Sequence, residues 1–353
     1  MRNHGIVVSG FLQLDGSKLV SGGLGAPLFD GQYLLDVTAT LDTAKAIGWR
    51  GGELFLDVQS HGGPNVATRQ IGSIQDPDNM DAGGETSLDR VWFQQSFAGR
   101  QIQARLGLMY VDDQFLTVPY GGNFVSLDFS SDASISTFVL PTFPKGAWGA
   151  DVFYRPTAWF SAGGGLFDGS GNTELPYNPG GRLAIGQIGV QGQIAGRPDS
   201  FEVGAWRHTG VFRRFAGGAA PLANGWYLVA SQWLYQPPGG GASGNGRGLG
   251  AFLQYGMAPP AVAAISRHLG GGLAWTGPFA ARPQDELGLA FSRGGLTPQD
   301  DFPHAAETEI EAYYQIRVAQ RLTIQPDWEY WFHPGGRRTP NALLALVRVM
   351  YHF

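Results

Sequence analysis

The last eleven residues of the chain, 343–353, restrict its fold more than any other segment. Every second residue from Leu343 to Phe353 is apolar, and the two nearest the end, Tyr351 and Phe353, are aromatic. The alternate positions include Arg348 and His352. Because successive side chains of a strand point to opposite faces, this segment has one wholly apolar face and one that accepts charge. Such a strand suits a position between lipid and water, where aromatic residues border the apolar band.

The same alternation recurs along the chain in segments of about ten residues, the length that a tilted membrane strand needs. Sixteen segments are predicted, an even number, as expected for a closed barrel whose two ends meet on one side. They are 5–14, 31–43, 51–61, 87–97, 100–110, 146–155, 157–168, 183–194, 200–208, 225–235, 247–257, 264–277, 285–293, 306–317, 320–332 and 343–353. We therefore predict an all-β fold, a single transmembrane antiparallel barrel formed by residues 1–353.

The connections between these segments differ in length on the two sides of the predicted barrel. The odd-numbered connections are mostly long, and the even-numbered ones are mostly tight turns, apart from the Pro- and Gly-rich stretch 236–246. This asymmetry is typical of outer-membrane barrels, with long extracellular loops and short periplasmic turns. It predicts that Phe353 lies at the periplasmic end. The long connections are 15–30, 62–86, 111–145, 169–182 and 209–224.

The longest connection, 111–145, is rich in aromatic residues, including Phe115, Tyr120, Phe124 and Phe129. So much aromatic area favours burial over exposure to water. We expect this loop to fold back into the lumen and form a constriction. The alternative is a loop that caps the barrel from outside.

Composition excludes several other classes of protein. The formal charge of −5 argues against nucleic acid as a partner. The sequence has no cysteine, which suits passage through an oxidising periplasm. It also has no run of about 18 apolar residues, as a membrane helix requires. Residues 1–10 lack the apolar core of a secretion signal, so export would imply that a signal has been removed.

Several motifs occur in a characteristic order along the chain. They are Leu-Asp-Arg-Val-Trp-Phe-Gln-Gln at 88–95, Arg-Pro-Gln-Asp-Glu-Leu-Gly-Leu at 282–289, Glu-Ile-Glu-Ala-Tyr-Tyr at 309–314 and Leu-Thr-Ile-Gln-Pro-Asp at 322–327. Together they resemble the carbohydrate-selective porins of the OprB type over most of the chain, with a poor match at 209–246. The resemblance implies a sixteen-stranded barrel in the bacterial outer membrane. It also implies diffusion of glucose-like sugars through an arginine-rich, partly aromatic constriction.

A neutral sugar needs hydrogen-bond donors and acceptors together with a flat apolar surface, and binding must stay weak enough for release. Residues of these types lie on the predicted lumen faces and in the loop 111–145. The other interpretation of each charged residue is simple solvation of a wide, wet lumen. The candidate solute-binding residues are Arg90, Trp92, Gln94, Arg105, Asp113, Phe115, Asp327, Glu329, Trp331 and Arg348.

The glutamates at 307, 309 and 311 share one strand face and could hold Ca²⁺ through carboxylate oxygens. Pairing across strands with Arg293 or Arg321 is the favoured interpretation, so no metal site is predicted. The chain has no Gly-x-Ser-x-Gly elbow and no metal-binding spacing among its histidines. We therefore predict neither catalytic residues nor a cofactor.

Three other functions remain open from the sequence. The same arginines would suit a channel for small anions such as gluconate or other carboxylates. A barrel that exports a polysaccharide would use the many tryptophans as a slide, and a lipid-hydrolysing barrel enzyme has only the fold in its favour. The expected partners are small carbohydrates and outer-membrane lipid, and the protein is expected to be a monomer or a homotrimer.

Overall fold

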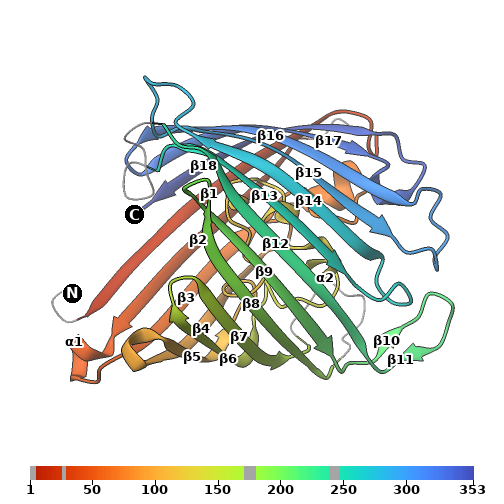
Figure 1. The fold of residues 1–353 in the computed structure, drawn as a ribbon. Helices are drawn as coiled ribbons and strands as arrows, with labels where there is room; N and C mark the ends of the chain where they lie inside the picture. Colours follow the sequence, from red (N-terminus) through yellow and green to blue (C-terminus); the bar gives the residue numbers. More distant parts are fainter. Residues whose placement is uncertain (1–4, 26–28, 171–179, 238–245) are drawn as a thin grey trace.

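The computed structural model describes residues 5–25, 29–170, 180–237 and 246–353. Within these ranges sixteen antiparallel strands close into a barrel (Figure 1), which confirms the predicted fold class. Closure is made by β1 (Ile6–Ser21) and β18 (Ala342–His352), which pair along ten positions of β1. The other strands are β2 (Phe29–Asp42), β3 (Gly52–Gly62), β4 (Glu85–Phe97), β5 (Ile102–Met109), β6 (Ala147–Thr157), β7 (Phe160–Asp168), β8 (Arg182–Ile194), β9 (Arg197–His208), β12 (Ala223–Tyr235), β13 (Gly248–Met257), β14 (Ile265–Thr276), β15 (Glu286–Leu296), β16 (Ala306–Ala319) and β17 (Leu322–Phe332).

The two faces of the wall differ as the alternation predicted. On β17, Trp328 and Tyr330 lie exposed on the outer surface. The alternate residues Asp327 and Glu329 are buried on the inner side. Side chains facing outward are largely apolar, and those facing inward include most of the buried charged groups. This arrangement places apolar surface where lipid would lie. None of the helices in the described ranges is long and apolar enough to cross a bilayer.

The first strand is six residues longer than predicted, because β1 begins at Ile6 and continues to Ser21. Asp15-Gly16-Ser17 resembles a turn in sequence, yet Asp15 pairs directly with Arg348 across β1 and β18. The bidentate ion pair between them satisfies the buried carboxylate, and the backbone of this segment pairs with β2 and β18. The expected long connection 15–30 is therefore wrong, and the strands are joined by 22–28.

The connections leave the barrel at two ends. We call the end carrying 63–84 and 110–146 the loop end, and the end near Phe353, with turns such as 158–159 and 195–196, the turn end. A short hairpin of β10 (Phe212–Arg213) and β11 (Ala219–Ala220) lies in the connection after β9. The turn end also carries a one-turn helix, α1 (Thr43–Ile47). Most of the predicted connections 169–182 and 236–246 lie outside the described residues.

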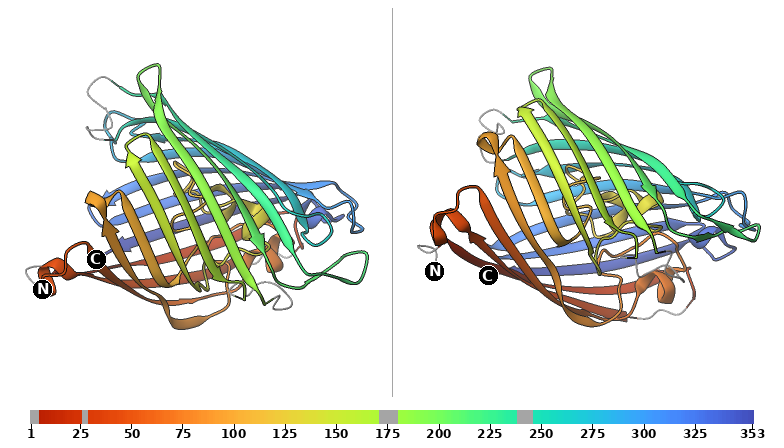
Figure 2. Two further views of the ribbon diagram at one scale, coloured as in Figure 1. Left: turned by 60° about the horizontal axis from the view of Figure 1, so that its bottom comes forward. Right: turned by 90° about the horizontal axis from the view of Figure 1, so that it is seen from below.

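Two loops fold into the barrel interior, as the coil inside the strands shows in Figure 2. We call 63–84 the first inner loop and 110–146 the second inner loop. The second contains η4 (Leu127–Phe129) and α2 (Ala133–Ser136), and the first contains the helical turn η2 (Ala67–Ile71). An inward course was expected for 111–145 alone.

Aromatic packing holds the second inner loop against the wall. Phe115 packs on Phe153 and Phe167, and Phe124 packs edge-on against Tyr313, so side chains of the loop and of three strands share one cluster. Strand β13 makes room through Gly250, where a Cβ atom would lie 2.7 Å from the ring of Tyr120. Residues of the second inner loop therefore fill the lumen next to β6, β7, β13 and β16.

Candidate functional site

A bulge in β4 places two charged residues inside the barrel next to each other. In the pairing of β3 with β4, Asp57 faces Arg90 and Val58 faces Leu88, so Asp89 is an extra residue. A bulge sets two residues opposite one and changes where their side chains point. Asp89 is buried, and the side chain of Arg90 keeps 17% of its surface exposed.

Arg90 joins the barrel wall to the second inner loop. Its guanidinium lies 2.6 Å from the carboxylate of Asp57 on β3 and 3.0 Å from that of Asp113 in the loop. The same group lies over the rings of Tyr110, at 4.7 Å, and Phe55, at 5.5 Å. Paired charges and aromatic faces hold the arginine in one orientation.

A second arginine lies on the next strand. Arg105 of β5 forms a bidentate ion pair with Asp151 of β6, with a shortest N–O distance of 2.6 Å. Asp113 lies 3.8 Å from it, between the two arginines. Trp92 lies under the guanidinium at 5.5 Å and stacks on Phe55. We call Arg90, Arg105, Asp57, Asp113 and Asp151 the arginine cluster.

Burial changes the acidity of the loop carboxyl groups near this cluster. It raises the pKa of Asp113, and the charges of Arg90 and Arg105 act in the opposite direction. It also raises the pKa of Asp112 to about 7, although the hydroxyl of Thr142 donates a hydrogen bond of 2.6 Å that lowers it. The ion pairs therefore favour the charged form of Asp113, and Asp112 titrates near neutral pH.

A cavity of 770 Å³ opens toward the turn end beside the arginine cluster. Its lining combines charged, amide and aromatic groups, including Asp113 at the loop, so it adjoins the ion pairs directly. A cavity of this volume is in the range that holds small molecules. The charged and amide side chains that line it are Asp113, Gln114, Arg155, Gln187, Gln191 and Glu202, and the hydroxyl residues Thr117, Thr157 and Ser161 and the aromatic residues Phe153 and Phe160 also line it.

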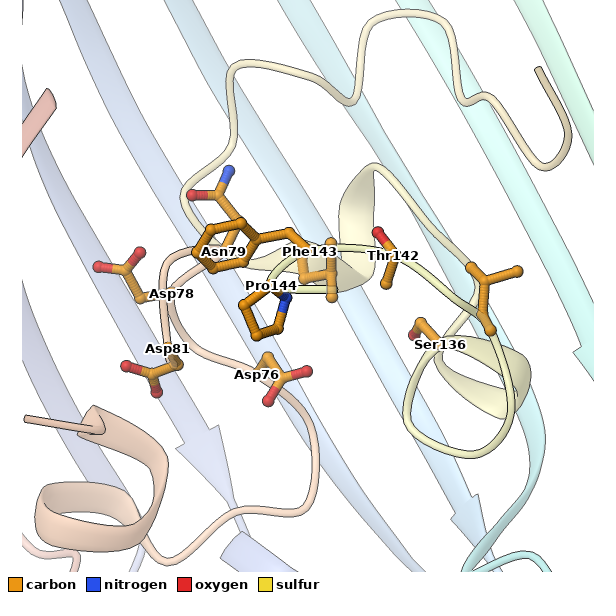
Figure 3. A pocket seen from close by; sticks show the side chains of 10 residues that line it. Asp76, Asp78, Asn79, Asp81, Ser136, Thr142, Phe143 and Pro144 are labelled. Carbon is orange, nitrogen blue, oxygen red and sulfur yellow. The ribbon is translucent and has the colours of Figure 1, made fainter. Parts of the chain in front are cut away.

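The two inner loops meet at a much smaller cavity, shown in Figure 3. Asp76, Asp78 and Asp81 of the first loop face Thr142 and Phe143 of the second across it. Its volume of 20 Å³ holds roughly one water molecule and excludes a sugar.

Arg348 lies beside this smaller cavity and ties the first inner loop to the wall. Besides its bidentate pair with Asp15, its Nη2 atom lies 3.3 Å from Asp78 and 2.8 Å from Asn79. With only 5% of its surface exposed, Arg348 is a buried anchor for the loop.

The glutamates of β16 anchor both inner loops. Glu307 accepts hydrogen bonds from the backbone N–H groups of Ile74, Gln75 and Gly335, and Glu311 accepts them from those of Val125 and Ser126. The expected pairing with Arg293 or Arg321 does not occur among the described residues. Loop backbone donors take the place of the arginines.

The predicted site residues separate into two groups. Arg90, Trp92, Arg105 and Asp113 come together in the arginine cluster and its aromatic border, and Gln94 is half-buried on the same face of β4. The other five are not part of it. Phe115, Asp327, Glu329, Trp331 and Arg348 are all at least 95% buried, so a solute has almost no access to them in this structure.

Sequence reasoning missed several residues of the larger cavity. Glu202 and Gln187 lie on inward faces of β9 and β8, where alternation is weakened by glycines, and Arg155 is the last residue of the predicted segment 146–155. Asp57 lies in the predicted segment 51–61, but nothing in the sequence indicates that it pairs with Arg90. Alternation places Glu202 and Asp57 on the inward faces of their strands, and this pattern could have identified them as lumen residues.

A closed sixteen-stranded barrel with inner loops and paired charges inside it defines a porin, which is a channel and not an enzyme. A family model described as "Carbohydrate-selective porin, OprB family" matches residues 32–353. The chain belongs to this family.

Curated relatives are distant in sequence. Porin B of Pseudomonas aeruginosa is 22% identical over 376 aligned positions, covering 89% of this chain and 80% of that protein. Porin AaxA of Chlamydia abortus is 24% identical over the aligned region. That region covers 72% of this chain and only 55% of the length of that porin.

Solved structures agree on the fold. The high-pH structure of Pseudomonas putida OprB superposes with a TM-score of 0.90 at 20% identity, covering 100% of this chain and 95% of that one. The low-pH structure of the same porin has a TM-score of 0.66 at 18% identity, covering 100% and 94% of the two chains.

Proposed function

We propose that this protein is a passive porin of the bacterial outer membrane for small, glucose-like sugars. Solute would contact the exposed edge of the arginine cluster and the walls of the 770 Å³ cavity. The observation that carries the proposal is the mixed chemistry at this place. Arg90, Asp113 and Gln114 offer donors and acceptors, and the partly exposed ring of Phe160 offers a flat apolar face. A neutral sugar needs both.

The balance of charge favours a neutral solute over an anion. Arg90 and Arg105 are both paired with carboxylates, and Arg155 interacts with Glu202 across the cavity. An anion entering this region would meet carboxylates close to each arginine, which cancels much of the attraction. The channel for gluconate-like anions therefore has less support than the sugar channel.

The second inner loop would form the constriction, since Asp113 is both part of the arginine cluster and a wall of the cavity. We place the loop end outside the cell and the turn end, with Phe353, in the periplasm. The asymmetry of the connections supports this orientation.

Liposome swelling with the purified protein tests the function. Glucose, a disaccharide, a small uncharged amino acid and gluconate would be compared at matched osmolarity. We expect glucose to enter faster than the similarly small amino acid, and the disaccharide to enter more slowly. If gluconate enters fastest, the protein is a channel for anions and not for sugars. If no solute causes swelling, the proposal of a passive porin is overturned.

A further inference from the structure

A second cluster of acidic side chains lies behind the inner loops, away from the arginine cluster. Glu309 and Glu311 of β16 and Glu329 of β17 each have an oxygen within 4.8 Å of the oxygens of the other two. All three residues are 0% exposed. Glu311 and Glu329 face each other directly in the pairing of the two strands, a position where like charges repel.

Asp327 adds a fourth carboxylate to this group. It is two positions before Glu329 on the inward face of β17, is 1% exposed, and interacts electrostatically with Glu311 and Glu329. Asp128 of the second inner loop interacts with Glu309. Burial of so many carboxylates is costly unless cations or hydrogen bonds compensate for the lost hydration.

The available partners leave several oxygens uncompensated. Glu309 accepts from Ser126, Glu329 accepts from the indole N–H of Trp331, and Glu311 accepts from two backbone N–H groups. One oxygen of Glu309, one of Glu329 and both of Asp327 are buried without a hydrogen-bond partner. Within the described ranges no Lys, Arg or His forms an ion pair with these four residues. Arg348 is paired with Asp15 and Asp78 and interacts with Asp327 and Glu311 only at longer range.

We propose that Glu309, Glu311, Asp327 and Glu329 bind a Ca²⁺ ion between the barrel wall and the second inner loop. The ligand type fits, because Ca²⁺ takes carboxylate oxygens in flexible geometry at about 2.4 Å. Three oxygens within 4.8 Å of one another are close enough to bind one ion after small shifts of their side chains. The ion would offset the repulsion between Glu311 and Glu329 and compensate the unpartnered oxygens.

Such an ion would also secure the second inner loop. Glu309 and Glu311 already bind Ser126 and Val125 of that loop, so neutralising the cluster would stiffen the wall to which the loop is attached. The competing explanation is a proton shared between Glu311 and Asp327, which are close enough to hydrogen-bond when one is protonated.

Terbium luminescence tests the proposal, because Tb³⁺ replaces Ca²⁺ and emits when a nearby indole is excited. The indole nitrogen of Trp331 lies 2.9 Å from Glu329, beside the proposed ion. Protein treated with a chelator should give sensitised Tb³⁺ emission that Ca²⁺ displaces. Trp331→Phe should lose this emission and still show the rise in unfolding temperature that Ca²⁺ produces in the unaltered protein.

Isosteric variants identify the ligands. Glu309→Gln and Glu329→Gln should each weaken Ca²⁺ binding roughly tenfold or more, since each removes a charged ligand. Glu307→Gln is the matched control, because Glu307 is equally buried on the same face of β16 and binds loop backbone instead. Its Ca²⁺ affinity should remain within about twofold of the original.

Three outcomes would overturn the site. The first is no displacement of Tb³⁺ by millimolar Ca²⁺, which would leave the shared proton as the explanation. The second is emission that persists in Trp331→Phe, which would place the ion near another tryptophan. The third is equal Ca²⁺ affinity in the two glutamine variants and the control. If the glutamine variants do not fold, Trp331→Phe, which keeps every carboxylate, decides the question.

Discussion

The Nη1 atom of Arg90 lies 3.0 Å from the Oδ1 atom of Asp113, and this ion pair joins the barrel wall to the second inner loop. Both side chains are partly exposed, at 17% and 23%. The pair is therefore accessible from the lumen, unlike the buried pair of Arg105 and Asp151. A solute that reaches this point meets a donor and an acceptor held at a fixed distance.

Replacing Arg90 with lysine should reduce sugar selectivity while keeping the charge. One ammonium group cannot bind Asp57 and Asp113 together and also lie flat on Tyr110 as the guanidinium does. Loss of one hydrogen bond of about 1 kcal/mol predicts a roughly fivefold fall in the rate of glucose entry relative to the small amino acid. Liposome swelling measures the ratio.

The exposed Arg100 in the turn between β4 and β5 provides the control, because Arg100→Lys should leave that ratio unchanged. An unchanged ratio in both variants would show that Arg90 has a structural role only.

Arg348→Ala should destabilise the barrel strongly. Removing the guanidinium leaves Asp15 and Asp78 buried without their cation and detaches Asn79 of the first inner loop. A broken buried pair costs about 3–5 kcal/mol, whereas Arg207→Ala, at an exposed position on β9, should cost less than about 0.5 kcal/mol. Urea unfolding in lipid vesicles, followed by tryptophan fluorescence, compares the two. Equal stability would mean that water compensates the two carboxylates.

The sequence predicted the strands well because lipid on one side and water on the other enforce strict alternation. Most strand ends fall within about three residues of the prediction. The exception is β1, where Asp15-Gly16 has the composition of a turn but lies in a strand. Here the backbone pairs with strands on both sides, and Asp15 binds Arg348, 333 positions away in the sequence, a contact that no local pattern reveals.

The sequence predicted which side chains face the inside of the barrel, but not which of them the inner loops bury. Alternation correctly placed Glu329, Trp331 and Arg348 on the inner face of the wall, and the two inner loops then covered them. That covering depends on contacts such as Ser126 with Glu309, 183 positions apart. Arg90 and Asp113 are different because each is bound from one side and faces the lumen on the other.

The stability of the protein should depend on the ionisation of Asp112. Burial raises the pKa of Asp112 to about 7, above the value of about 3.9 in an unfolded chain. The folded state therefore holds this proton more tightly, and the resulting stabilisation is complete below about pH 4 and is lost as the pH rises through 7. Asp112→Asn should show a smaller fall in unfolding free energy between pH 4 and pH 7 than the unaltered protein.

A second variant checks the sign of this effect. Thr142 donates a hydrogen bond that lowers the pKa of Asp112, so Thr142→Val should move the loss of stability to higher pH. A shift to lower pH, or identical pH profiles for Asp112→Asn and the unaltered protein, would contradict the assignment.

Substitutions of Phe115 distinguish a structural role of this residue from a role in solute binding. Its side chain is fully buried, and it packs on Phe153 and Phe167 at ring distances of 5.0 and 6.4 Å. Phe115→Ala should cost about 3–5 kcal/mol through the cavity that it leaves. It should also loosen the second inner loop, so single-channel ion conductance should rise and discrimination between glucose and the disaccharide should fall. Phe115→Leu, which keeps most of the volume, should change both quantities much less. If Phe115 instead contacts the sugar, the alanine variant would lose glucose preference at unchanged ion conductance.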